Sequence, residues 1–372
     1  MKITSIQTYR VKIPSNGDYR MARGAHDALR SLLVRLETDE GVVGIGESHQ
    51  GVAGYSHETV STMDLVITEA YAPEIIGCEL AAPEALVRKM ADARRGNLFA
   101  RCAVEMALWD ALGRASGKPI VELLGGPFRR ELMLSASIGI DTPSVMAEKA
   151  IRYVSGGYRT VKIKVGTADV QADITRIREI RKAVGQDVAI RIDANEGYSP
   201  DTALVFIRGI DGLNVEHVEQ PVAAERMDAM AALTRLGIVP ILADESVHTP
   251  EDAHRLIAMQ AAHAIKLKLT KVGGYIAARK IIDLAEAAGL KVVIGQGICS
   301  SIEAAAEAQL ACAYPHIHPV AEMVGPTKLL GDLVETPLDL KSGRLTLPDG
   351  PGTGVRLSEA LLRKYTVSGS VG

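Results

Sequence analysis

The stretch TVKIKVGTADV, residues 160–170, places two lysines in an otherwise apolar strand pattern. Apolar residues alternate there with Lys162 and Lys164, and a glycine ends the run. Because successive side chains of a strand point to opposite faces, both lysines lie on the same face. Paired lysines are common at a solvent-exposed sheet edge, where they discourage aggregation. The rest of the chain favours a buried strand with a chemical use for both charges.

Short apolar strands recur along the chain from about residue 132 onward. They are LSASIGI, TVKIKV, VAIRIDAN, VEHVEQP, PILADES, AIKLKL, KVVIGQ and HPVAEM. Between most of them lies a segment with the apolar spacing of a helix, such as ADITRIREIRKAV. This alternation predicts an α/β fold with parallel strands and crossover helices, and about eight units predict a closed TIM-type barrel. No G-x-G-x-x-G follows a strand, which disfavours a doubly wound dinucleotide-binding sheet.

The first 125 residues predict a separate α+β domain. Two strand patterns, RSLLVRLET and GVVGIGES, are joined by a turn at residues 38–41, which predicts a hairpin. Helical patterns follow at residues 57–70, 83–94 and 98–116, and Gly117 is the expected C-cap of the last one.

The C-terminal segment, residues 337–372, contains TPLDLKSGRLTLPDGPG, which predicts a strand, a turn and a second strand. We expect this tail to pack back on the first domain. The predicted organisation is a capping domain at residues 1–125, a barrel at residues 126–336, and a tail at residues 337–372 that completes the cap.

Composition disfavours several classes of protein. The 372 residues are 47% hydrophobic and 23% charged, as in an ordinary globular protein. A net charge of −3 offers no electrostatic footprint for nucleic acid or for an anionic membrane. No apolar run approaches the length of a membrane span, and the N-terminus has no signal-peptide pattern. The four cysteines are scattered without metal-binding or disulfide spacing, which predicts a reduced, cytoplasmic protein.

Polar residues stand at the ends of the predicted strands, where barrels of this type carry their chemistry. Asp193, Glu219 and Asp244 end three consecutive strands. A loop position or a helix cap would explain any one of them, but three in register converge on one point. Buried carboxylates repel one another unless a cation neutralises them. A hard divalent ion such as Mg²⁺ prefers oxygen ligands, so the sequence predicts a metal site.

Lysine pairs end the strands on either side of the three acidic ones. Lys162 and Lys164 precede the acidic strands, and Lys266 and Lys268 follow them. The two pairs would therefore face each other across the metal. A lysine beside another cation titrates closer to neutrality and can act as a base. We expect a lysine to transfer the proton next to a substrate carboxylate while the metal stabilises the enolate.

Several motifs match those of one known enzyme family. They are ARCAVEMALWDALGRASGKPIVELLG at residues 100–125, the pattern from Ile190 to Pro221, and the short motifs KIKVG, ADES and KLTKVGG. The chain thus resembles the enolase superfamily, in the branch of mandelate racemase and muconate lactonizing enzymes. The resemblance implies a capping domain over a modified (β/α)7β barrel, a Mg²⁺ or Mn²⁺ ion, and often an octamer. The implied metal ligands are Asp193, Glu219 and Asp244, and the implied catalytic residues are Lys164, its helper Lys162, and the opposing Lys268.

Within this branch, two stretches resemble the muconate cycloisomerase group, namely RRGNLFARCAVE and AEMVGPTKLLGDLV. Three departures bear on the substrate. Cys299 stands where that group has an acidic residue, and Lys266 stands where many members have asparagine. Ala321-Glu322-Met323 replaces the aspartate pair that marks dipeptide epimerases.

Further residues are candidates for substrate contact. Asn195 shares the inward face of its strand with Asp193. Cys299 is expected to line the pocket rather than to act as a nucleophile, because no activating base is evident. Glu322 ends the last strand, where a substrate contact and a structural ion pair are both open. Gly-rich loops of the first domain add four candidates, which would bind the distal end of an anionic substrate or be solvated: Arg20, Arg23, His26 and Tyr55.

The sequence therefore predicts a metal-dependent isomerase of a small-molecule carboxylate, namely a cycloisomerase of a muconate-like diacid. Racemisation or epimerisation of an N-acyl amino acid or a related derivative is the first alternative, and dehydration of a sugar acid or hydroxy acid is the next. An inactive metal-binding structural protein is disfavoured, because the lysine and carboxylate set is intact. We expect a homo-oligomer, an octamer or a dimer, with no nucleic-acid or membrane partner.

Overall fold

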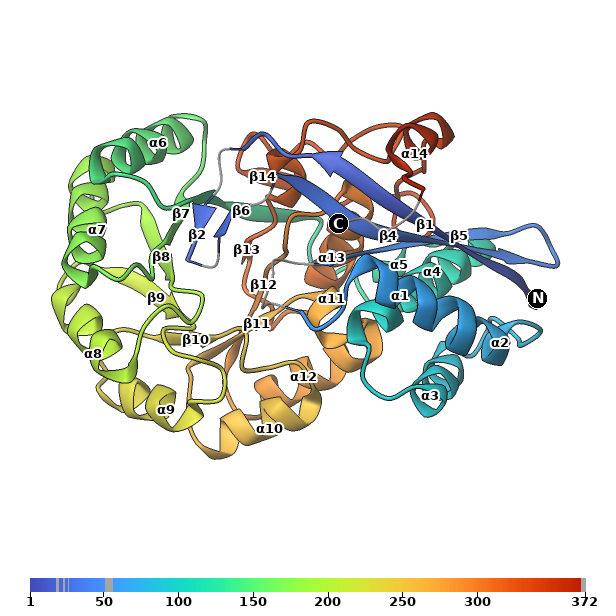
Figure 1. The fold of residues 1–372 in the computed structure, drawn as a ribbon, viewed down its shortest axis with the longest axis horizontal. Helices are drawn as coiled ribbons and strands as arrows, with labels where there is room; N and C mark the ends of the chain where they lie inside the picture. The colour runs from blue at the N-terminus through green and yellow to red at the C-terminus, as the bar shows by residue number, and fades with distance from the viewer. Residues whose placement is uncertain (18–19, 23, 26, 51–55, 369–372) are drawn as a thin grey trace.

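Parallel strands close into a barrel in the larger part of the molecule (Figure 1). The computed structural model describes residues 1–17, 20–22, 24–25, 27–50 and 56–368. Within them the barrel strands follow the order β12-β11-β10-β9-β8-β7-β6-β13, and the isolated parallel bridges Val292–Ile317 and Gly295–Glu322 join β12 to the β13 side. The strands are β6 (Glu131–Ile138), β7 (Thr160–Lys164), β8 (Ala189–Asp193), β9 (Val215–Glu219), β10 (Ile241–Ala243), β11 (Ala264–Leu267), β12 (Lys291–Ile294) and β13 (Val320–Ala321).

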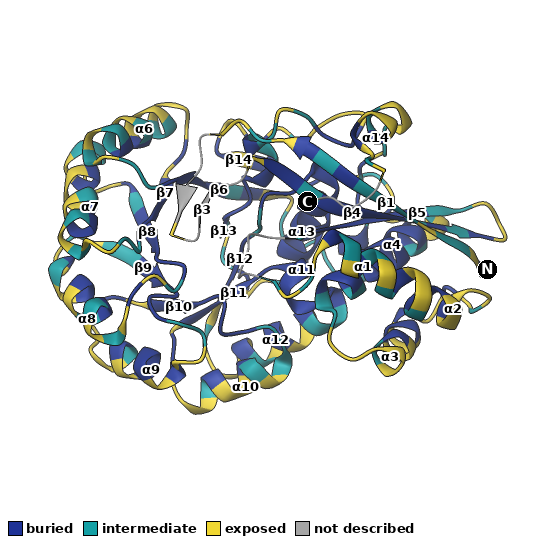
Figure 2. Ribbon diagram, in the orientation of Figure 1, coloured by how far each residue is buried: buried dark blue, intermediate teal, exposed yellow. Residues whose placement is uncertain are grey.

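Helices surround this barrel on the outside, as the predicted strand–helix alternation requires. They are α6 (Pro143–Ser155), α7 (Val170–Val184), α8 (Pro200–Gly209), α9 (Met227–Arg235), α10 (Pro250–Ala258), α11 (Leu269–Val272), α12 (Tyr275–Ala287) and α13 (Ser301–Ala313). Figure 2 shows buried strands inside and exposed residues on the outer faces of α6 to α10 and α12, whereas α11 and α13 are buried along their whole length. All five residues of β7 are buried, both lysines included. The solvent-edge explanation for Lys162 and Lys164 is therefore wrong, and the predicted α/β barrel is confirmed.

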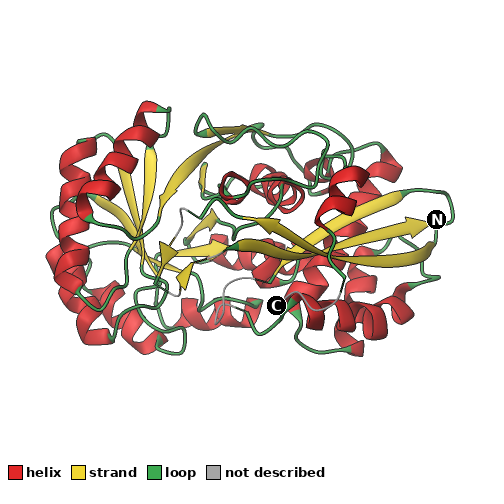
Figure 3. Ribbon diagram, turned by 45° about the horizontal axis from the view of Figure 1, so that its top comes forward, coloured by secondary structure: helices red, strands yellow, loops and turns green. Residues whose placement is uncertain are grey.

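The N-terminal part is a three-stranded antiparallel sheet covered by helices (Figure 3). Strands β1 (Ile3–Pro14), β4 (Ala28–Thr38) and β5 (Val43–His49) pair in that order, which confirms the predicted hairpin. The covering helices are α1 (Val60–Val66), the π-helix η1 (Ile67–Tyr71), α2 (Ala72–Ile75), α3 (Pro83–Ala93) and α4 (Leu98–Ser116). Gly44 and Gly46 allow β5 to lie directly on α4, because a Cβ at these positions would lie 2.1 Å from the Ala107 oxygen and 2.0 Å from the Ala103 oxygen.

Three short elements lie outside this sheet. The hairpin of β2 (Arg20–Met21) and β3 (Gly24–Ala25) stands between β1 and β4 in the chain and lies near the barrel strands in Figure 1, and α5 (Ile120–Leu123) leads from α4 to β6.

The C-terminal tail differs in part from its prediction. The first predicted strand is irregular, and the second, β14 (Arg344–Thr346), pairs with β6 of the barrel. The reason is that β7 pairs with β6 only from Ser135 onward, so the first residues of β6 have free backbone groups that β14 satisfies. The later helix α14 (Glu359–Tyr365) does lie against the cap, where the Val367 amide donates to the Arg10 oxygen at 2.9 Å. The division at residues 125 and 336 remains a prediction.

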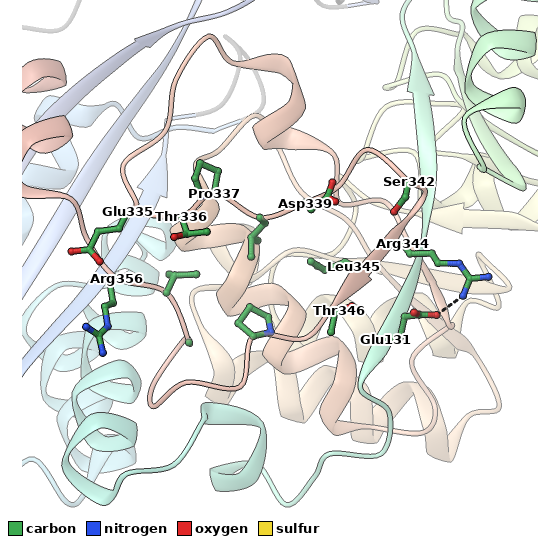
Figure 4. A pocket seen from close by; sticks show the side chains of 14 residues that line it. Glu131, Glu335, Thr336, Pro337, Asp339, Ser342, Arg344, Leu345, Thr346 and Arg356 are labelled. Carbon is green, nitrogen blue, oxygen red and sulfur yellow. Dashed lines mark hydrogen bonds and ion pairs between the residues drawn. The ribbon is translucent and has the colours of Figure 1, made fainter.

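A hollow of about 520 Å³ lies beside this tail (Figure 4). Its walls include Glu131 and Arg344, which form an ion pair at 2.7 Å, and the exposed residues Glu335, Thr336 and Arg356. Glu131 is the first residue of β6, so the hollow lies at the amino end of that strand. Because barrels of this type carry their chemistry at the carboxyl ends, the candidate site is sought there.

Candidate active site

The predicted acids and lysines gather at the carboxyl ends of five neighbouring barrel strands. Lys164, Asp193 and Glu219 are the last residues of β7, β8 and β9, and they lie side by side in the strand register. Asp244 and Lys268 directly follow β10 and β11. In the barrel order, β7 and β11 are separated by the three acidic strands, so Lys164 and Lys268 lie on opposite sides of the carboxylates. All three carboxylates are at most 1% exposed.

Each of the two outer lysines is paired with one of these acids. The Lys164 Nζ donates to Asp193 Oδ2 at 2.7 Å and to Asn195 Oδ1 at 2.6 Å. The Lys268 Nζ donates to Asp244 Oδ2 at 2.6 Å. Burial raises the pKa of both acids, but the neighbouring ammonium groups lower it more. The pKa of Asp193 and that of Asp244 therefore lie below the usual range. Both carboxylates are therefore charged.

Two residues that the sequence analysis did not assign hold these partners in place. The Lys271 Nζ, which is fully buried, donates to Asp244 Oδ1 at 2.8 Å and to the Lys266 carbonyl oxygen at 2.9 Å. The Glu245 Oε1 accepts from Asn195 Nδ2 at 3.0 Å, so Glu245 orients the amide that holds Lys164. The signal for both was their place in the motifs KLTKVGG and ADES. The short helix α11 brings Lys271 back to the site.

The inner lysines form a second layer below the outer ones. The Lys162 Nζ contacts Asp193 Oδ2 at 2.8 Å, Glu219 Oε2 at 2.7 Å and Glu322 Oε2 at 2.6 Å. The Lys266 Nζ contacts Glu219 Oε2 at 3.1 Å and also forms an ion pair with Glu322. Arg191 donates to Glu322 Oε1 at 3.2 Å. Glu322 is thus held by three cationic side chains.

The donor set fits a divalent metal ion. Burial, with the neighbouring charge of Asp193 next, raises the pKa of Glu219 to about 7, so a further cation would favour its charged form. Among the described residues, Glu219 Oε1 is buried without a hydrogen-bond partner, while Oε2 faces the two inner lysines. An unsatisfied carboxylate oxygen beside Asp193 and Asp244 is what a hard, oxygen-preferring cation requires.

A second group with metal-ligand spacing consists of His217, Glu219 and Glu322, whose ligand atoms lie within 4.8 Å of one another. The ammonium groups of Lys162 and Lys266 already contact both glutamates there. Burial lowers the pKa of His217 to about 4, so the ring is neutral. Lysines contact the carboxylates of this group, as they also contact Asp193 and Asp244, so the assignment of the metal ligands stays a prediction.

The other residues predicted to contact substrate are Cys299 and the four loop residues of the first domain. Cys299 is fully buried, and burial raises the pKa of its thiol, which leaves it a poor nucleophile. Its predicted contact with substrate stays a prediction. Arg20 lies on β2, where its backbone pairs with Ala25. The other three loop candidates, Arg23, His26 and Tyr55, lie outside the described residues.

A cavity of about 690 Å³ opens at the carboxyl ends of β6 and β7. It is bordered by Ala22, next to β2, and by Gly166, two residues beyond Lys164. The residues after β6 form another wall, from Ile140 to Pro143, and Arg176 of α7 closes the side. The cavity has the size that small-molecule ligands occupy, and the acids and lysines of the site are not among its wall residues.

The chain matches two family profiles and has relatives along its whole length. Residues 3–125 match the family described as "Mandelate racemase / muconate lactonizing enzyme, N-terminal domain", and residues 145–361 match "Enolase C-terminal domain-like". An L-Ala-D/L-Glu epimerase of Bacillus subtilis is 34% identical over 98% of this chain and 99% of its own. A chloromuconate cycloisomerase of Cupriavidus pinatubonensis is 33% identical over 97% of both chains.

Solved structures of the same family are similar to this chain over nearly its whole length. The N-succinyl Arg/Lys racemase of Bacillus cereus superposes with a TM-score of 0.94 at 31% identity, covering 99% of each chain. A dipeptide epimerase of Enterococcus faecalis, complexed with Mg and the dipeptide L-Leu-L-Tyr, has a TM-score of 0.90 at 32% identity and covers 96% of this chain and all of its own. These similarities extend over cap and barrel together.

Proposed function

This chain belongs to the mandelate racemase and muconate lactonizing enzyme family of the enolase superfamily, and from that premise we propose that it is a metal-dependent isomerase of a carboxylate substrate. The observation that carries the proposal is the arrangement of Lys164 and Lys268 on opposite sides of three buried carboxylates. Such an arrangement can add or remove a proton at either face of one carbon atom. Its relatives are isomerases that act on small carboxylates, which supports the same class here.

Each residue of the site has a role in this proposal. Asp193, Glu219 and Asp244 would hold Mg²⁺ or Mn²⁺. The ion would act as a Lewis acid that stabilises negative charge on a substrate carboxylate. Lys164 and Lys268 would transfer the proton at the carbon next to that carboxylate. The magnesium in the Enterococcus faecalis epimerase supports this choice of metal.

We propose that the substrate is a muconate-like diacid. One carboxylate oxygen adds to the diene carbon three bonds from its own carboxyl carbon and closes a lactone ring. The electrons of the double bond at that carbon shift toward the other carboxylate, and a lysine delivers a proton to the carbon beside the other carboxylate. Two observations support this choice over dipeptide epimerisation. The aspartate pair of those enzymes is absent, and Glu322 is occupied by Lys162, Lys266 and Arg191.

Racemisation of an N-acyl amino acid is the second candidate. It uses the same two lysines, one to remove the α proton and the other to return a proton on the opposite face. The full-length similarity to the Bacillus cereus racemase favours it specifically.

One experiment separates these reactions. The protein is incubated in D2O with Mg²⁺ and, separately, with cis,cis-muconate, N-succinyl amino acids and dipeptides. A lactone carrying one deuterium supports cycloisomerisation, and deuterium at the α carbon with loss of optical activity supports racemisation. The matched control is the Lys164→Ala/Lys268→Ala double variant, which should show neither. Absence of exchange with every carboxylate of the panel would overturn the proposal.

Localisation and assembly stay predictions. Among the described residues, no helix is long and apolar enough to cross a membrane. We propose a cytoplasmic homo-oligomer, a dimer or an octamer, which light scattering after size-exclusion chromatography would test.

A further inference from the structure

Two lysines and two glutamates alternate in a closed ring of charges in the barrel interior. Glu219 Oε2 lies 2.7 Å from Lys162 and 3.1 Å from Lys266, and Glu322 Oε2 contacts the same two ammonium groups. None of the four side chains is more than 9% exposed. Each of the two ammonium groups touches both carboxylates, so a change of charge at one member acts on the others.

The two lysines of the ring differ in their contacts outside it. Lys162 also contacts Asp193, whereas the ammonium group of Lys266 forms ion pairs only with Glu219 and Glu322 among the described residues. The backbone makes room for its stem, since a Cβ at Gly295 would lie 2.5 Å from the Lys266 Cδ. The same Gly295 forms the bridge to Glu322 that closes the barrel. The pocket around Lys266 is therefore shaped for a buried lysine.

The position of Glu219 in the ring makes the lysine compete with a metal ion. Oε2 faces the two ammonium groups, and Oε1 is the unpartnered oxygen offered to the metal. The positive charges of the ammonium groups next to Oε2 reduce the attraction of the same carboxylate for a metal ion at Oε1. Glu322 acts in the opposite direction, because it draws both lysines toward itself.

We infer that Lys266 and Glu322 form a charge-balancing pair that sets the metal affinity of Glu219. Lys266 is an internal cation that weakens metal binding, and Glu322 is the anion that offsets it. This inference rests on the metal role proposed above for Glu219. With Lys266 but without Glu322, the protein's own cations would neutralise Glu219. With Glu322 but without Lys266, the barrel interior would carry an excess of buried negative charge.

Titration with Mn²⁺, followed by the electron paramagnetic resonance signal of the free ion, tests the pair without any substrate. Lys266→Met should bind Mn²⁺ about tenfold or more tightly than the wild type, because one nearby positive charge is lost. Glu322→Gln should bind it about tenfold or more weakly, for the opposite reason. The double variant removes both charges and should return to within about threefold of the wild type.

A role of Lys266 in merely holding Glu219 in position predicts the opposite sign, since its loss would then weaken binding. Weaker or unchanged binding by Lys266→Met overturns the inference. If that variant does not fold, as judged by circular dichroism, unchanged Mn²⁺ affinity of Glu322→Gln overturns it instead. Lys280→Met is the matched control, because it removes an exposed positive charge on α12 and should leave the affinity unchanged. A wild type that binds no Mn²⁺ would contradict the proposed function itself.

Discussion

At the scale of single residues, the pairing of lysines with carboxylates decides which side chains can react. Lys164 and Lys268 each contact one aspartate at the outer layer, whereas Lys162 contacts three carboxylates in the inner layer. The outer lysines are therefore the better proton-transfer groups. Lys162 organises the acids around it, which is consistent with a helper role that acts through its neighbours.

Replacing either outer lysine should remove a proton-transfer group. We expect Lys164→Ala and Lys268→Ala each to lower kcat by about 100- to 10,000-fold on the substrate that the exchange experiment identifies. Steady-state kinetics measure the loss, and Lys280→Ala on the surface of α12 is the control. Near wild-type turnover in both variants would show that the lysines do not carry the reaction.

At the scale of elements, short segments set the fine position of the site. The four residues of α11 turn the chain so that Lys271 reaches Asp244, and the bridge between Gly295 and Glu322 brings the last strand next to β12. Glu105 of α4 performs a similar task between cap and barrel. Its Oε1 accepts from the Ile276 amide at 2.8 Å, which satisfies the first turn of α12.

Glu105 should make stability depend on pH. Burial raises the pKa of Glu105 to about 7, and its Oε2 is buried without a hydrogen-bond partner among the described residues. A carboxyl group with a raised pKa contributes stability that is complete below its ordinary pKa and is lost as the pH rises through 7. Glu105→Gln keeps the acceptor but cannot ionise. Relative to the wild type, its free energy of unfolding should therefore rise by about 1 to 3 kcal/mol between pH 5 and pH 8.

Urea denaturation at a series of pH values measures this difference. Glu179→Gln, on the exposed face of α7, is the control and should show no such trend. A Glu105→Gln effect that is the same at pH 5 and pH 8 would mean that Glu105 does not titrate in this range.

At the scale of the whole molecule, the buried lysines should keep the protein folded when no metal ion is bound. Lys164 and Lys268 already pair with Asp193 and Asp244, so the carboxylates are compensated without a metal ion. We expect exhaustive chelation to abolish activity and Mg²⁺ or Mn²⁺ to restore it, while circular dichroism shows that the metal-free protein stays folded. Full activity in a sample that metal analysis shows to be empty would refute the metal assignment, and unfolding on chelation would refute the compensation by lysine.

The cysteines should leave global stability independent of reductant. All four are free thiols, and three of them are buried: Cys102, Cys299 and Cys312. Because there is no disulfide to constrain the unfolded chain, the Tm should be the same with and without a reducing agent. A decrease of several degrees on reduction would reveal a cross-link.

The sequence by itself determined the architecture and the membership of the outer site. Strand and helix periodicities report which face of an element is buried, and a parallel barrel brings the carboxyl ends of its strands together. Asp193, Glu219, Asp244, Lys164 and Lys268 could therefore be placed around one point from their positions alone. The same reasoning failed for the tail, because strand patterning does not state which edge a short strand will find, and β14 paired with free backbone groups of β6.

Only the tertiary structure decided the inner layer. Periodicity places Lys266 and Glu322 inside the barrel but says nothing of which partners their side chains reach. That depends on barrel closure, which puts the end of β13 beside β12, and on the space that Gly295 leaves for the lysine stem. The ring with Lys162 and Glu219 joins residues at four strands across the barrel. Its stability depends on burial and on the hydrogen-bond distances between its ammonium nitrogens and carboxylate oxygens. Such long-range pairing of charges is a property of the packed interior, where a buried charge must find a counter-charge wherever the fold provides one.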